Sequence, residues 1–74
     1  MDVLVESEAG RLRWWVEDLP GHALPGRAVR LEAHGPKLGP VHPDRQGGWC
    51  EISGQGTVAV VDAETGVSAV LEVR

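Results

Sequence analysis

Alternation of apolar and polar side chains is the main pattern of this chain, and it predicts short β-strands. In the most regular run, Arg11–Glu17, alternate positions carry Leu12, Trp14 and Val16. Because successive side chains of a strand point to opposite faces, we expect these three side chains inside the protein and Trp15 outside. Adjacent tryptophans and a β-branched valine favour a strand over a helix, and a Pro-Gly pair follows shortly afterwards.

The same alternation recurs in other short runs between turn signals. Further strands are predicted at Asp2–Glu6, Ala28–Ala33, Trp49–Ile52, Thr57–Val61 and Val67–Val73. Clusters of glycine and proline predict turns at residues 9–10, 20–26, 44–48 and 54–56, and residues 34–43 are expected to be extended or looped. Any strand inside 34–43 would lie on a sheet edge, because its prolines lack the amide donor. Residues 62–66 would join the last two strands as a hairpin.

Six or seven short strands at this spacing predict an all-β fold, a small antiparallel β-sandwich. With 74 residues the chain is expected to form a single domain, 1–74. Val29, Leu31 and Ala33 should face the interior. In the C-terminal hairpin, the side chains expected to share one face are Val58, Val60, Val67, Ala69, Leu71 and Val73.

Charge and composition exclude several functions. The formal net charge of −4 argues against a nucleic-acid partner. A single cysteine, Cys50, excludes an internal disulfide. No segment approaches the ~20 apolar residues of a membrane span. The acidic N-terminal segment lacks a signal peptide's features, so the expected location is cytoplasmic by default, or extracytoplasmic if the chain is a trimmed fragment.

Several short motifs resemble those of carboxypeptidase regulatory-like and transthyretin-like (prealbumin-like) β-sandwich domains. In the first half they are Val16-Glu-Asp18, Gly21, Leu24-Pro25-Gly26 and Val29-x-Leu31. In the second half they are Asp44-x-x-Gly47 followed by Trp49 and Ile52, Gly56-Thr-Val58-x-Val60, and Val67–Val73. The resemblance spans residues 12–73 and implies a transthyretin-like sandwich, with an Ig-like sandwich as the alternative.

The family's spacing after Gly47 would place Glu51 inside. Either Gly48 takes the glycine role, which places Cys50 and Ile52 inside, or a bulge shifts the register. Such domains usually act as folding aids, spacers or recognition modules. The C-terminal SAVLEVR does not match the motif of the hydroxyisourate hydrolases on this fold, so the resemblance implies no catalytic residue.

The candidate binding residues are Trp15, Trp49, Val61 and Val70. The chain has three tryptophans and neither Phe nor Tyr, and both Trp15 and Trp49 are expected on outer faces. With Val61 and Val70 at outward positions of the hairpin, they would form an apolar patch suited to a protein partner or to self-association. The alternative for each tryptophan is a place in the core or under a loop. Exposed indoles also stack on sugars, so carbohydrate recognition is the second functional hypothesis.

The remaining candidates do not indicate chemistry. His22, His34 and His42, with Asp44 and Cys50 nearby in sequence, match no compact metal pattern, so no metal or cofactor is expected. Cys50 on a short strand is interpreted as a small buried side chain. Acidic residues in the 62–66 turn are expected to be solvated. The chain is therefore predicted to be non-enzymatic, with edge strands near Val3–Val5 or Val67–Val73 able to pair with another chain.

Overall fold

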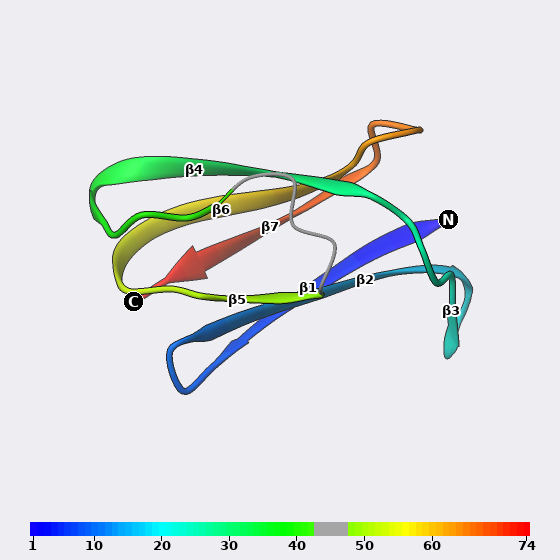
Figure 1. Ribbon diagram of the computed structural model, residues 1–74, viewed down its shortest axis with the longest axis horizontal. Helices are drawn as coiled ribbons and strands as arrows, with labels where there is room; N and C mark the ends of the chain where they lie inside the picture. Colours follow the sequence, from blue (N-terminus) through cyan, green and yellow to red (C-terminus); the bar gives the residue numbers. More distant parts are fainter. Residues whose placement is uncertain (43–47) are drawn as a thin grey trace.

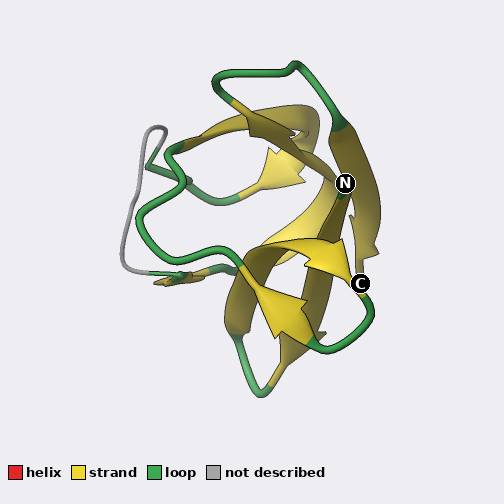
Figure 2. Cartoon of the chain, turned by 90° about the vertical axis from the view of Figure 1, so that its right-hand side faces the viewer, coloured by secondary structure: helices red, strands yellow, loops and turns green. Residues whose placement is uncertain are grey.

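The computed structural model describes residues 1–42 and 48–74, and this part of the chain forms seven strands and no helix. Figure 1 shows the strands in two layers, and Figure 2 shows them joined by turns and loops. The strands are β1 (Asp2–Glu8), β2 (Arg11–Leu19), β3 (His22–Ala23), β4 (Val29–Leu38), β5 (Trp49–Glu51), β6 (Gly54–Asp62) and β7 (Ser68–Val73). The predicted small antiparallel β-sandwich is confirmed.

One layer, sheet A, is built around β2. Strand β1 pairs antiparallel along nearly all of β2, from Asp2 opposite Glu17 to Glu8 opposite Arg11. The other side of β2 is shared by two short strands: β5 pairs with its first residues and β3 with its last. Strand β3 was not predicted; its two residues follow the turn at Gly21 (φ +77°).

The second layer, sheet B, has the order β4-β6-β7, with every neighbouring pair antiparallel. Strand β6 is central. Strand β4 is one edge, as the prolines in residues 34–43 require of any strand there. No helix in the described part of the chain has the length and apolar character needed to cross a membrane.

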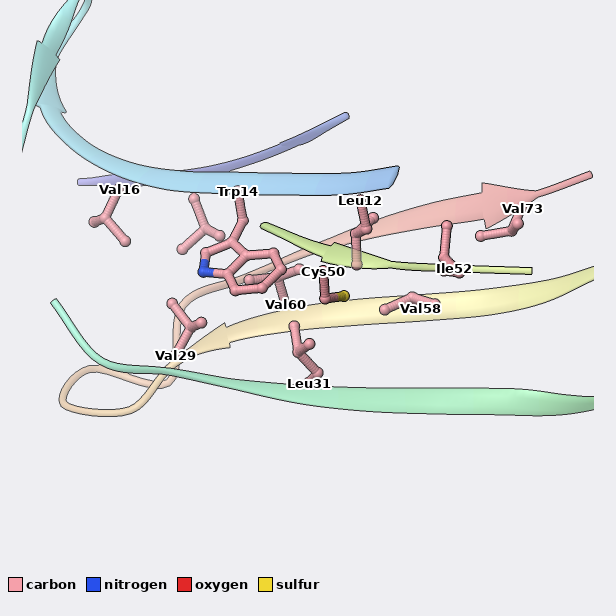
Figure 3. Packing of buried hydrophobic residues seen from close by; sticks show 11 residues of the cluster. Leu12, Trp14, Val16, Val29, Leu31, Cys50, Ile52, Val58, Val60 and Val73 are labelled. Atoms are coloured by element: carbon pink, nitrogen blue, oxygen red, sulfur yellow. The ribbon is translucent and has the colours of Figure 1, made fainter. Parts of the chain in front are cut away.

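The hydrophobic core lies between the two sheets and contains the side chains that the alternation places inside (Figure 3). Leu12, Trp14 and Val16 are all buried, with Trp14 only 5% exposed. The other members of the buried cluster are Val3, Val29, Leu31, Cys50, Ile52, Val58, Val60 and Val73. The inward period-two pattern of the predicted strands is thus confirmed at most positions, but two predicted inward residues are exposed. Ala33 lies near the sheet edge, and Val67 (38% exposed) precedes β7 rather than beginning it.

The register ambiguity around residues 47–52 is settled in favour of Gly48. Cys50 and Ile52 are buried, whereas Glu51 is exposed. Gly48 has a φ of +79°, a conformation in which glycine carries no steric penalty. The inward position that the family spacing gives Glu51 is therefore wrong. Asp44 and Gly47 of the same motif lie outside the described residues.

One predicted boundary is wrong where β4 meets β6, because residues 54–56 begin β6 rather than forming a turn. The segment after Ala33, expected to be extended or looped, is extended as far as Leu38, where β4 ends. The pairing shifts register between His34 and Lys37. A side chain at Gly56 would place its Cβ 2.6 Å from the carbonyl oxygen of His34. These glycines therefore serve close approach of two strands at a bulge.

The turn after β6 contains a buried carboxylate, which contradicts the expectation of solvated acids there. Asp62 is 0% exposed and sits on the inward face of β6, opposite Val29. Its oxygens accept bonds from Arg27 Nη2 (2.6 Å) and Nε (3.2 Å). They also accept bonds from the backbone N (3.0 Å) and Oγ1 (2.6 Å) of Thr65. Arg27 also pairs with Glu64.

These contacts control ionisation at the turn. The hydrogen bond from the Thr65 hydroxyl lowers the pKa of Asp62 from its ordinary value; burial opposes this, and the Arg27 guanidinium lowers it further. The same carboxylate raises the pKa of Arg27. The ionised Asp62 therefore links the β6–β7 turn, through its hydrogen bonds to Arg27, to the segment that precedes β4.

Candidate functional site

Trp15 and Trp49 lie on the outer face of sheet A. Trp15 alternates with the buried Trp14 along β2, and Trp49 precedes the buried Cys50 on β5. The two strands are neighbours, with Arg13 of β2 directly opposite Trp49. Trp49 is 45% exposed and Trp15 is half-buried. The pleat of one sheet therefore brings both indoles to one surface.

Arginines and carboxylates surround the two indoles. The guanidinium of Arg11 lies 5.1 Å from the centre of the Trp49 ring, and that of Arg13 lies 5.9 Å from the Trp15 ring. Arg13 also pairs with Glu6 of β1 at 3.0 Å. We call this surface the Trp–Arg face, and it comprises Glu6, Arg11, Arg13, Trp15, Glu17 and Trp49.

The hydrogen bonding of Trp15 shows how the face is ordered. Its Nε1 donates to Oε2 of Glu17, two residues along the same strand, over 2.7 Å. Oε1 of Glu17 accepts a bond from the backbone N of Gly21 in the following turn (3.1 Å). Each exposed cation–π contact is worth about 0.5–1 kcal/mol. Side chains held in this way lose less rotamer freedom when a partner covers them.

The other two predicted binding residues are not part of this surface. Val61 and Val70 belong to β6 and β7 of sheet B. The outer faces of the two layers point in opposite directions, so a patch combining them with the indoles does not form. Val61 is only 7% exposed, whereas Val70 is 63% exposed. The single apolar patch expected from the sequence is therefore wrong in composition, and the indoles stand without the valines.

A shallow hollow of about 200 Å³ adjoins the Trp–Arg face and was not predicted. Its lining includes Trp14 and Trp15 of β2 together with Leu24, Pro25 and Arg27. The hollow lies where β2 passes from its pairing with β5 to its pairing with β3. The Leu-Pro-Gly step signals a turn in the sequence, but its approach to β2 depends on tertiary folding.

The histidines and the cysteine are dispersed. Nδ1 of His22 lies 2.5 Å from Oδ1 of Asp18, and this bond lowers the pKa of the Asp18 carboxyl. His34 lies on β4, and His42 lies in the loop that follows β4. Cys50 is 1% exposed in the core. Within residues 1–42 and 48–74, no three His, Cys, Asp or Glu side chains are placed to hold a metal ion.

Asp62 and Glu64 of the β6–β7 turn are paired with Arg27. Their carboxylates are therefore engaged with a cation of the chain itself. No family model matches the chain, and comparisons with curated proteins and with solved structures give no significant match.

Proposed function

We propose that this chain is a non-enzymatic protein-interaction module that binds a protein partner through the Trp–Arg face. The observation that carries the proposal is the exposed Trp49, stacked with Arg11 on the outer face of sheet A beside Trp15 and Arg13. Tryptophan and arginine are the residues most enriched at the energetic centres of protein interfaces. Here Arg11, Arg13 and Trp15 lie on β2, and Trp49 lies on the neighbouring β5.

The charge pattern of the face supports a protein partner. Guanidinium and carboxylate groups adjoin the indoles, as in the Arg13–Glu6 pair and the Trp15–Glu17 bond. Such mixed groups provide hydrogen bonds around an apolar centre. The molecule measures 34 × 22 × 17 Å, so one broad face is comparable with the ~800 Å² that each partner buries in a standard interface.

The resemblance of residues 12–73 to carboxypeptidase regulatory-like and transthyretin-like domains supports the same role, because such domains commonly serve as accessory and recognition modules. The shared motifs fall mostly on turns and core positions, such as Val29 and Leu31, whereas the Trp–Arg face is made from Trp15, Trp49 and their arginine neighbours. Fold and recognition are thus attributed to different residues.

Quantitative co-precipitation tests this proposal with three immobilised proteins: the wild-type chain, Trp49→Ala and Val70→Ala. Val70 is the matched control because it is an exposed apolar side chain on the opposite sheet. We expect the proteins retained by the wild type to be lost with Trp49→Ala and kept with Val70→Ala, while circular dichroism shows all three folded. Equal retention by the wild type and Trp49→Ala would contradict the proposal.

Carbohydrate recognition is a second candidate, favoured by the hollow beside Trp15 and by the exposed Trp49 ring. Sugars bind aromatic rings by stacking, and Trp49 already has Arg11 against its ring. Titration with a panel of soluble oligosaccharides, followed by tryptophan fluorescence, separates the two functions. A saturable change that Trp49→Ala abolishes would assign the face to sugar binding.

A further inference from the structure

Strand β4 has one side that no described strand covers. It is an edge of sheet B and pairs only with β6 among the described strands (Figure 1). The carbonyl of Ala28 accepts a bond from the amide of Ala63, on the β6 side (3.0 Å). In an antiparallel strand, the backbone N–H and C=O groups of one residue point to one neighbouring strand, and those of the next residue point the opposite way. Val29, Leu31 and Ala33 therefore direct their N–H and C=O groups toward the open edge.

Among the described residues, no hydrogen bond is found to these outward-directed backbone groups. A row of such groups can pair with another strand. Pairing is confined to the first part of β4, because the register shifts between His34 and Lys37 and Pro36 has no amide hydrogen. The available segment thus runs from residue 28 to residue 34.

The charges on this segment are self-complementary. Arg30 and Glu32 flank Leu31 on the outer face of the sheet, where their side chains are 51% and 44% exposed. Within one chain they form a pair at 3.2 Å. If two copies of β4 run antiparallel with Leu31 opposite Leu31, Arg30 of each copy lies opposite Glu32 of the other.

The hydrogen-bonding pattern favours this register. Leu31 opposite Leu31 is a hydrogen-bonded pair, since both residues direct their groups to the edge. Arg30 opposite Glu32 is then a non-hydrogen-bonded pair, in which Cα atoms are only ~4.5 Å apart and side chains are closest. Moving the two-fold axis by one residue places Arg30 opposite Arg30, or Glu32 opposite Glu32, and like charges so placed are destabilising.

We propose that the β4 edge is a self-association surface whose occupant is the β4 strand of a second copy of this chain. The two copies join antiparallel about Leu31 and form one continuous six-stranded sheet, β7-β6-β4 followed by β4-β6-β7 of the second copy. The interface is isologous, as a two-fold dimer requires. It lies on sheet B and leaves the Trp–Arg face of sheet A uncovered.

A charge-reversal series tests the proposal in the full chain. Arg30→Glu places two acidic pairs across the two-fold axis, and Glu32→Arg places two basic pairs there. An equimolar mixture of the two variants restores opposite charges at both pairs, and so does the double variant Arg30→Glu/Glu32→Arg. Because both side chains are about half exposed, the substitutions leave the core intact. Sedimentation equilibrium measures the dimer dissociation constant, with Trp49→Ala as a control.

The wild type, the double variant and the mixture are expected to dimerise. Each single variant should dimerise about tenfold more weakly, because two opposite-charge pairs across the two-fold axis become like-charge pairs. Trp49→Ala should dimerise as the wild type does. A monomeric wild type, single variants that dimerise normally, or a mixture that stays monomeric would overturn the proposal. Loss of the dimer in Trp49→Ala would also overturn it and assign self-association to the Trp–Arg face.

Discussion

Replacing the buried carboxylate by Asp62→Ala is the perturbation whose effect on folding the structure defines best. Asp62 is completely buried and accepts bonds from two nitrogens of Arg27 and from the amide and hydroxyl of Thr65. The substitution removes all of these acceptors at once. It leaves the Arg27 guanidinium, whose side chain is 19% exposed, with Glu64 as its remaining carboxylate.

The loss of stability on Asp62→Ala depends on how the Arg27 guanidinium is left. Removing one member of a buried ion pair costs roughly 3–5 kcal/mol, chiefly because the other charge stays buried without its partner. Here Arg27 keeps some solvent contact and the Glu64 pair, so we expect the lower end, about 3 kcal/mol. A domain of this size has a total stability of roughly 4–11 kcal/mol. At about 4–8 °C per kcal/mol, the melting temperature should fall by about 12–24 °C.

Urea unfolding followed by tryptophan fluorescence measures this change, because the indole of Trp14 is buried in the core and reports its loss. The control is Glu72→Ala, which removes an exposed carboxylate whose partner Arg74 is 86% exposed. The control should alter stability by less than about 0.5 kcal/mol. A loss below about 1 kcal/mol for Asp62→Ala, within the range of an exposed pair, would refute the reasoning.

Three further predictions concern the same fold. The pKa of the Asp62 carboxyl is lower in the folded state than in the unfolded state. Its contribution to the free energy of unfolding is therefore fully present above the unfolded-state pKa and is lost as pH falls toward the folded-state pKa. Urea titrations at a series of pH values should show the stability difference between the wild type and Asp62→Ala shrinking below about pH 4. Trp14→Ala empties the centre of the core and should cost about 3–5 kcal/mol, measured by circular dichroism during urea unfolding, and a smaller loss would place the indole outside the core. Gly56→Ala brings a Cβ 2.6 Å from the carbonyl oxygen of His34, whereas Gly66→Ala meets no atom within 4 Å and carries only the strain of φ +77°. Calorimetry should therefore give a loss of about 1–2 kcal/mol for Gly66→Ala and a larger one for Gly56→Ala, and the reverse order would contradict the close strand approach.

The sequence was most informative where burial is a local property. Alternation alone placed Leu12, Trp14 and Val16 in the core, because the strand period of two applies whichever sheet the strand joins. It could not assign strands to sheets. Val61 and Val70 were therefore grouped with the indoles although they belong to the opposite layer.

Long-range contacts account for the other errors. From the sequence alone, Asp62 is interpreted as a solvated turn residue. Its partner Arg27 lies 35 positions earlier, and only the folded chain places the two side chains together. Gly54 and Gly56 read as a turn because glycine punctuates turns, but at this site β4 passes too close to β6 for a side chain. Both features depend on the pairing of β4 with β6, and the local alternation of apolar and polar residues in either strand does not indicate that pairing.

Recognition through the Trp–Arg face can be observed residue by residue with ¹⁹F NMR of the chain labelled with 5-fluorotryptophan. Trp14, Trp15 and Trp49 give three probes: one in the core, one half-buried and one exposed. A partner protein retained in the co-precipitation is added in increasing amounts. We expect the Trp49 and Trp15 signals to shift or broaden while the Trp14 signal changes least. Saturable binding that leaves the Trp49 and Trp15 signals unchanged would contradict this expectation.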